Sequence, residues 1–242
     1  MKIDVVPLPR MLTDEHVRDR VVVVFDVLRA TTTIAAALYS GAKEIRVFDS
    51  LEAARSAAVE FTSEKLLCGE SKCLAPQGFD LGNSPVTYKR GVVSGKTLFL
   101  STTNGTRALV AARNASLLLT GALVNARAVA GALKARWQDV TLLCAGTDGE
   151  IATEDLLGAG AVLSHLRDID GIRMSEHARR TESMFQDASP DIVSVFMATQ
   201  GGQNVFSAGL SEDLFFASQL DALDVVPRCD GFNMTIRPMP LP

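Results

Sequence analysis

The 242-residue sequence predicts an α/β protein with a largely parallel sheet. Short runs rich in Val, Ile and Leu alternate with alanine-rich runs of helical length, an order that produces parallel strands joined by right-handed crossovers. Residues 21–25, Val-Val-Val-Val-Phe, are apolar at every position, which is typical of a strand buried on both faces of a parallel sheet. Because no linker rich in Pro, Gly and Ser divides the chain, we expect a single domain over residues 1–242.

The elements follow in order from the amino terminus. Residues 3–6 predict a short strand at a sheet edge, where the prolines that follow do no harm. Strand 21–25 leads into an alanine-rich helix over 31–39, which Gly41 ends. Further strands are expected at 44–48, 65–68, 97–100, 116–120, 140–144 and 224–228. Further helices are expected at 51–61 after the capping Ser50, at 106–112, at 125–135, from 153 onward, from Pro190 through 197, and at 211–220.

The charge and the apolar pattern exclude several classes of protein. A formal net charge of −4 argues against a protein dedicated to nucleic acids or anionic membranes. No apolar run approaches the roughly 20 residues of a membrane span, and residues 1–20 lack the apolar core of a signal peptide. We therefore expect a cytoplasmic protein whose four cysteines are reduced, and the apolar fraction of 47% is compatible with a homodimer.

Three polar loops each follow a predicted buried strand, at residues 26–33, 101–107 and 146–155. Because parallel strands put their carboxyl ends on one side of a sheet, where ligands bind in open α/β folds, all three loops could face one crevice. Asp26, Arg29 and the hydroxyls of residues 31–33 form a set suited to a metal ion and an oxyanion.

The second loop, Ser101-Thr-Thr-Asn-Gly-Thr-Arg107, is the best candidate for binding phosphate. Gly105 would allow close approach of the backbone, and N–H groups at the start of the next helix would point toward an anion. Arg107 adds a charge that can bind an anion through two nitrogens. The alternative is an ordinary Asn-Gly turn followed by a threonine cap.

A long segment and several carboxylates complete the candidates. Residues 71–90 contain Pro and Gly at close intervals and predict a long loop, and loops of this length in compact domains are usually functional or mobile. Magnesium takes one or two carboxylates together with water and substrate oxygens. The candidate carboxylates are Asp26, Glu70, Asp80, Asp148, Glu150, Glu154 and Asp155. Adjacent helix positions point about 100° apart, so Glu154 and Asp155 would not serve equally.

Five segments together resemble the 2-phosphosulfolactate phosphatase family, and they occur in the same order along the chain. They are Asp26–Thr33, Gly69-Glu70, Phe79–Pro85, Ser101–Thr106, and Glu154-Asp155 with Ala159-Gly160. The resemblance implies a magnesium-dependent acid phosphatase that converts 2-phospho-3-sulfolactate to 3-sulfolactate and phosphate, a step of coenzyme M biosynthesis in methanogens. It also implies a single three-layer α/β/α fold with a mixed sheet.

These expectations combine into one hypothesis about roles. Asp26 is the metal ligand or the nucleophile, and Glu70 with Glu154 or Asp155 completes the metal shell or acts as acid and base. Arg29 and Arg107 neutralise the substrate. Phosphate or sulfonate oxygens would be held by Thr31, Thr32, Thr33, Thr102, Thr103, Asn104, Gly105 and Thr106, while Asn83 and Ser84 close over the substrate. Two alternatives stay open, a phosphatase for another small 2-phospho acid and a non-catalytic protein that binds anions.

Overall fold

The computed structural model describes residues 1–240 and places ten strands in one mixed sheet. The order across the sheet is β4-β5-β3-β10-β9-β6-β2-β7-β1-β8. In chain order the strands are β1 (Lys2–Val6), β2 (Val21–Phe25), β3 (Glu44–Phe48), β4 (Lys65–Gly69), β5 (Thr97–Ser101), β6 (Leu117–Gly121), β7 (Val140–Cys144), β8 (Arg173–Met174), β9 (Val226–Asp230) and β10 (Thr235–Met239). All five side chains of β2 are buried, as its apolar sequence predicts.

The sheet consists of two parallel blocks joined by an antiparallel hairpin. One block is β4-β5-β3 and the other is β6-β2-β7-β1-β8. Hairpin β9–β10 lies between them and pairs antiparallel with β6 on one side and β3 on the other. The sheet is therefore mixed and largely parallel, as predicted. Because three antiparallel pairings separate the blocks, the strands of one block run opposite to those of the other.

Two predictions about strands are corrected. The strand predicted at an edge, β1, lies between β7 and the two-residue β8, which forms the edge instead. The strand predicted at 224–228 begins two residues later, and the second strand of its hairpin, β10, was not predicted. Arg237 and Pro238 interrupt the apolar pattern of β10, and only Thr235 and Ile236 pair with β3.

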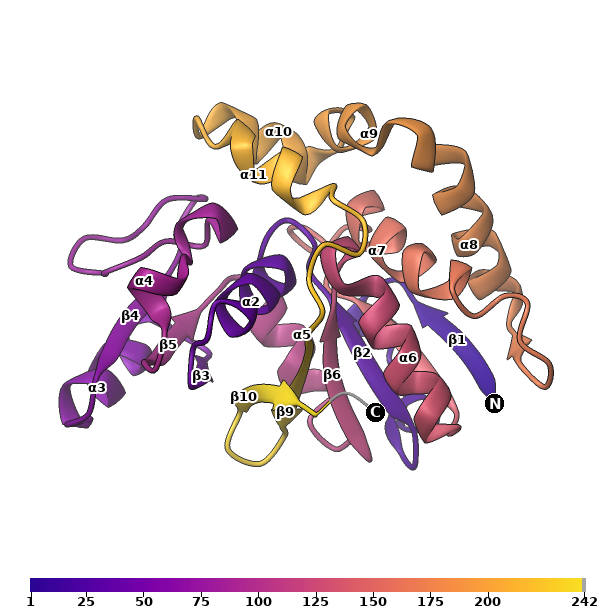
Figure 1. Cartoon of the computed structure of the whole chain (residues 1–242), viewed down its shortest axis with the longest axis horizontal. Helices are drawn as coiled ribbons and strands as arrows, with labels where there is room; N and C mark the ends of the chain where they lie inside the picture. The colour runs from indigo at the N-terminus through magenta and orange to yellow at the C-terminus, as the bar shows by residue number, and fades with distance from the viewer. Residues whose placement is uncertain (241–242) are drawn as a thin grey trace.

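Helices flank the sheet and give the three-layer α/β/α arrangement (Figure 1). In chain order they are α1 (Asp14–Val17), α2 (Ala30–Tyr39), α3 (Leu51–Glu60), α4 (Arg90–Val93), α5 (Gly105–Ala111), α6 (Ala126–Arg136), α7 (Thr153–Ser164), α8 (Glu176–Ala188), α9 (Ile192–Ala198), α10 (Gln200–Ser207) and α11 (Ser211–Ala217). The fold class is confirmed. Within residues 1–240, none of these helices has the length and apolar character needed to cross a membrane.

The last four helices, α8 to α11, form an arch that starts against α7 and ends above α2 (Figure 1). Helix α10 was not predicted, because adjacent glycines disfavour a helix. The fold requires Gly202, since a Cβ there would lie 1.8 Å from the carbonyl oxygen of Phe196. The arch brings a late part of the chain over loops that follow the early strands.

Candidate active site

A cleft of about 620 Å³ lies where the loops after β2, β4, β5 and β7 meet α10. Its lining includes Asp26, Glu70, the segment 102–104, the segment 147–148 and Asn204. The prediction that three polar loops face one crevice is confirmed. The expected cause, that parallel strands end on one side of the sheet, applies only to β2 and β7. Strands β4 and β5 run in the opposite direction, so their carboxyl ends do not lie on the same side of the sheet as those of β2 and β7.

A second groove, of about 530 Å³, lies over β6, β9 and β10. Its charged lining residues are Arg228, Asp230 and Arg237, all of them exposed. No buried carboxylate lines this groove among residues 1–240. The chemistry that the sequence predicts is therefore concentrated in the first cleft.

Asp26 lies at the base of the cleft, immediately after the central strand β2. One of its carboxylate oxygens, Oδ1, accepts the N–H of Ala30 at 3.1 Å, at the amino terminus of α2. The other oxygen lies against the backbone of Gly105, where a Cβ would be 2.9 Å from it. The close approach predicted for Gly105 is thus to Asp26, and a side chain there would push the carboxylate out of place.

Burial and like charges keep Asp26 from ionising as readily as an exposed aspartate. The pKa of Asp26 is raised from 3.8 to about 6, chiefly by burial and also by the negative charges of Glu70 and Glu154, against the opposing hydrogen bond from Ala30. The pKa of Asp155 is raised well above its usual range by burial and then by Asp26 and Glu154. Several carboxylates therefore share a poorly solvated site, which is how cation sites are commonly built.

Glu154, in the first turn of α7, is 1% exposed. Neither of its carboxylate oxygens has a hydrogen-bond partner among residues 1–240. Burial raises the pKa of this carboxyl as well, and its own backbone N–H and the nearby Thr199 hydroxyl offset only part of that rise. A buried carboxylate without partners is costly, because each oxygen has lost its water without a replacement. Its two oxygens are consequently free to bind a cation.

The neighbouring Asp155 has a different role. Its Oδ1 accepts the N–H of Val27 at 2.8 Å and its Oδ2 accepts the N–H of Gly146 at 2.9 Å. These bonds join the residues that follow β2 to those that follow β7. The structure thus separates the two adjacent carboxylates, as their helical spacing predicts, and it leaves Glu154 as the better metal ligand.

Glu70 binds two loops to each other. Its Oε1 accepts the N–H and the hydroxyl of Thr103, at 3.1 and 2.6 Å, and its Oε2 accepts the N–H of Cys73 at 3.1 Å. The carboxylate lines the cleft, but both oxygens already have partners in the chain. The geometry favours a positioning role over the predicted role as ligand or acid.

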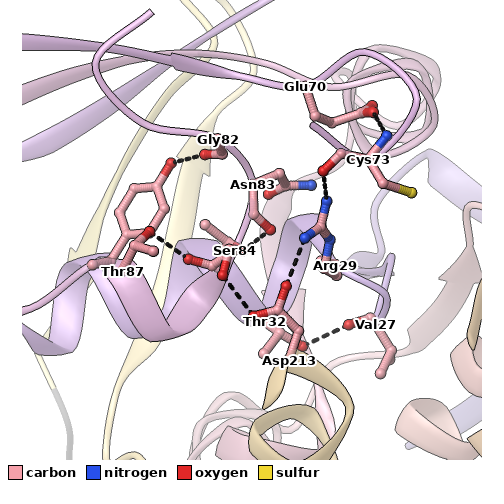
Figure 2. Close-up of polar contacts among 12 residues, drawn as sticks. Val27, Arg29, Thr32, Glu70, Cys73, Gly82, Asn83, Ser84, Thr87 and Asp213 are labelled. Carbon is pink, nitrogen blue, oxygen red and sulfur yellow. Dashed lines mark hydrogen bonds and ion pairs between the residues drawn. The ribbon is translucent and has the colours of Figure 1, made fainter. Parts of the chain in front are cut away.

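Arg29 forms a buried ion pair that the sequence did not predict. Its Nη1 donates to Asp213 Oδ2 at 2.6 Å, and the side chains of both residues are almost fully buried. Figure 2 shows the guanidinium between Asp213 and the carbonyl oxygen of Cys73, to which its Nη2 donates. The other oxygen of Asp213 accepts the hydroxyl of Ser84 at 2.6 Å. Ser84 therefore holds Asp213 rather than the substrate.

The three consecutive threonines of α2 are not available to bind the substrate as predicted. Thr31 donates its hydroxyl to the carbonyl oxygen of Asp26, Thr32 to that of Val27, and Thr33 to that of Asn83. None of the three lines the cleft. Buried hydroxyls in a helix require acceptors, and these backbone carbonyls supply them.

The second loop is only partly in the cleft. Thr102, Thr103 and Asn104 line it. Thr106 turns inward and contacts the hydroxyl of Thr102 at 3.3 Å, whereas Arg107 is exposed on α5 and lies outside the cleft. The prediction that Arg107 binds the substrate is therefore not supported.

Asn83, on the long loop, lines the cleft as predicted. Its Oδ1 is buried and has no hydrogen-bond partner among residues 1–240. The loop that carries it is held from both sides, because Tyr88 donates its hydroxyl to the carbonyl oxygen of Gly82 at 2.6 Å and Asp80 accepts the N–H of Leu67 at 2.7 Å. An amide fixed in this way can bind a ligand with little loss of conformational entropy.

The donor set fits magnesium. Residues 1–240 contain no group of three or more His, Cys, Asp and Glu side chains arranged to hold a metal ion. Magnesium, however, needs only one or two carboxylates, and substrate oxygens and water complete its shell. Asp26 and Glu154 supply buried oxygen donors, and those of Glu154 have no hydrogen-bond partner among residues 1–240. They are the residues that would hold the ion.

Gly201, in α10, is expected to be intolerant of a side chain. A Cβ there would lie 1.9 Å from Glu154 Oε1, so Gly201→Ala must displace the buried carboxylate. We expect a loss of about 1 to 3 kcal/mol in the free energy of unfolding, measured by urea titration. Gly131→Ala in α6 is the matched control, because a Cβ there meets nothing within 4 Å, and it should be neutral or stabilising. Equal stability of the two variants would contradict the packing of α10 on Glu154.

Comparison with known proteins gives one consistent family. The model of the family described as 2-phosphosulpholactate phosphatase matches residues 7–231. A probable 2-phosphosulfolactate phosphatase of Carboxydothermus hydrogenoformans is 40% identical over 227 residues, which cover 94% of this chain and 92% of that protein. Proteins with the same description from Synechocystis and from Clostridium perfringens strain SM101 are 37% and 35% identical, and the matched regions cover 94% and 93% of this chain and 96% and 92% of theirs. The chain therefore belongs to the 2-phosphosulfolactate phosphatase family.

Proposed function

We propose that this protein hydrolyses the phosphomonoester of 2-phospho-3-sulfolactate, with magnesium, to give 3-sulfolactate and phosphate. The observation that carries the proposal is a pair of buried carboxylates: Asp26 lines a polar cleft, and Glu154 lies directly behind Gly201, which also lines it. The family membership and the names of the relatives supply the substrate. The cleft of about 620 Å³ has room for a small phosphoester of this kind.

Magnesium, when bound, would polarise the phosphoryl group and stabilise the charge that develops on its oxygens. The residues of the chain supply the rest. Asp26 must be ionised to act, and its position is fixed by Ala30 and by the close backbone of Gly105. Asn83 presents a side-chain amide to the substrate, and Asp155 holds the ends of β2 and β7 together around it.

Two routes of hydrolysis are compatible with this arrangement. In one, an oxygen of Asp26 attacks phosphorus, the alcohol leaves, and water then cleaves the acyl phosphate. In the other, water attacks phosphorus directly and Asp26 acts only as a ligand or base. Rapid quenching with substrate labelled in the phosphate separates the routes, because only the first leaves label on the protein.

A screen for phosphate release tests the function against its rivals. We expect hydrolysis of 2-phospho-3-sulfolactate that is lost with a chelator and restored by magnesium. If another 2-phospho acid, such as 2-phosphoglycerate or phospholactate, is hydrolysed in preference, the protein is a phosphatase but its substrate is not the one proposed. Tight binding of these compounds without any phosphate release would instead indicate a non-catalytic anion-binding protein.

A further inference from the structure

Two basic side chains line the cleft among residues 1–240, Arg29 and Lys72. The charge of Arg29 is already balanced by Asp213, at 2.6 Å in a buried pair. Lys72 differs, because its ammonium group makes no hydrogen bond or ion pair with any residue in this part of the chain and its side chain is exposed at the rim. It is therefore the cleft's uncommitted positive charge.

The turn that carries Lys72 is held in an unusual conformation. Lys72 and Cys73 have φ angles of 52° and 67°, in the left-handed region that non-glycine residues rarely adopt. Ser71 and Leu74 exchange backbone hydrogen bonds of 2.9 and 3.2 Å across the turn, and Glu70 accepts the N–H of Cys73. Backbone strain of this kind is found at ligand clamps, where the surrounding contacts maintain it.

The charges of the proposed substrate require a second positive group. 2-Phospho-3-sulfolactate carries a phosphate, a carboxylate and a sulfonate. A divalent ion bound by Asp26 and Glu154 is balanced by those two carboxylates, and Arg29 is balanced by Asp213. The carboxylates of Glu70 and Asp148 also line the cleft, and among the described lining residues only Lys72 carries a positive charge that no ion pair engages. An ammonium on a flexible stem suits a non-planar oxyanion such as a sulfonate.

We propose that Lys72 determines substrate specificity by binding the sulfonate of the substrate, an inference that rests on the proposed function. The phosphate reacts at the base of the cleft, beside the buried Asp26. The part of the substrate that does not react then extends toward the rim, where the turn 71–74 holds Lys72.

Paired substrates test the assignment. 2-Phosphoglycerate has a hydroxyl in place of the sulfonate and keeps the phosphate and the carboxylate. We expect Lys72→Gln to reduce kcat/KM for 2-phospho-3-sulfolactate by about 10- to 100-fold and to change that for 2-phosphoglycerate by less than about threefold. Most of the loss should lie in KM, and Lys72→Arg should recover much of it. Gln keeps an unbranched polar side chain, one atom shorter than that of Lys, and the same backbone conformation, so the main change is the loss of the charge.

Lys89→Gln is the matched control, since Lys89 is an exposed lysine on the same long loop but outside the cleft. This substitution should leave kcat/KM for both substrates unchanged. If Lys72→Gln loses kcat/KM equally for both substrates, or loses it for neither, the assignment of Lys72 to the sulfonate is overturned. If the wild-type protein releases phosphate from neither compound, the proposed function fails, and calorimetry then decides the inference separately. In that case 3-sulfolactate should still bind the wild type more tightly than lactate does, and Lys72→Gln should abolish the difference, whereas equal binding would refute the role of Lys72.

Discussion

Asp26→Asn is expected to reduce turnover at least about 1,000-fold, equivalent to about 4 kcal/mol, while making the metal-free protein more stable at pH 8. The loss of turnover follows because the amide cannot serve as an anionic metal ligand or nucleophile. The gain in stability follows because Asn keeps the oxygen that accepts the N–H of Ala30 and removes a buried charge. Both effects follow from replacing one carboxylate oxygen by an amide nitrogen. Measured together, they test both the catalytic role of the Asp26 charge and the cost of burying it.

The sign of the pH dependence follows from the raised pKa of Asp26. Its pKa is 3.8 in the unfolded reference and about 6 in the fold, so a proton on this group stabilises the folded state. That stabilisation is complete below pH 3.8 and is lost as pH rises through 6, a difference of roughly 3 kcal/mol at pH 8. The Asn variant should therefore gain most over the wild type at pH 8 and progressively less toward pH 5.

Urea titration of the metal-free proteins at pH 5 and pH 8 measures this difference. Asp187→Asn serves as the control, because Asp187 is exposed on α8 and lies outside the cleft. It should change stability little at either pH. A gain for Asp26→Asn that is the same at both pH values would contradict the raised pKa, and near-normal turnover would contradict the central role of Asp26. Adding magnesium should reduce the stability advantage of Asp26→Asn over the wild type at pH 8, because the ion stabilises only the protein that keeps the carboxylate.

The part of the site that the sequence predicted is the part encoded by neighbouring residues. The run 21–25 has the apolar pattern of a central strand, and Asp26 follows it directly. The loop containing Thr102 and Thr103 follows β5 in the same way, and it lines the cleft. In each case the local pattern places a polar residue at the end of a buried strand, and no distant contact is needed to identify it.

The rest depended on contacts between distant segments. Asp213 has the sequence context of an exposed residue in the first turn of a helix, yet α11 places it against Arg29, 184 positions away. The hydroxyls of residues 31–33 could serve a ligand or a backbone carbonyl, and only the folded chain shows which carbonyls lie nearby. The reversal of β4 and β5 relative to β2 follows from hairpin β9–β10, whose second strand has no clear sequence pattern.

Asp213→Ala is expected to destabilise the protein by about 3 to 5 kcal/mol, because it leaves the buried Arg29 guanidinium without its counter-charge. The pair joins α11 to the start of α2, and Ser84 adds the long loop to the same carboxylate (Figure 2). One substitution thus loosens three segments around the cleft. Urea titration at pH 7.5 gives the change in free energy, and phosphate release from the same samples shows whether the cleft is disturbed.

The destabilisation expected for Asp213→Ala is attributed to the burial of the ion pair and not to ion pairing as such. An exposed ion pair in the same chain provides the comparison. Arg180 and Glu176 on α8 form a pair with the same N–O separation of 2.6 Å, but their side chains are 76% and 69% exposed. Glu176→Ala should therefore change the stability by less than about 0.5 kcal/mol. If the two substitutions have similar effects, the Arg29–Asp213 pair does not act as a buried bond between the segments.

A double-mutant cycle separates the loss of the pair from the charge that is left behind. Arg29→Met with Asp213→Ala removes both charges, and the double variant should be more stable than Asp213→Ala alone, since no buried charge is left unpaired. Asp213→Asn keeps the shape and an acceptor for Ser84, so its cost should fall between those of Ala and the wild type. If the double variant loses as much free energy of unfolding as the two single variants lose together, the two side chains act independently. The observed geometry, with both side chains almost fully buried at 2.6 Å, predicts strong coupling instead.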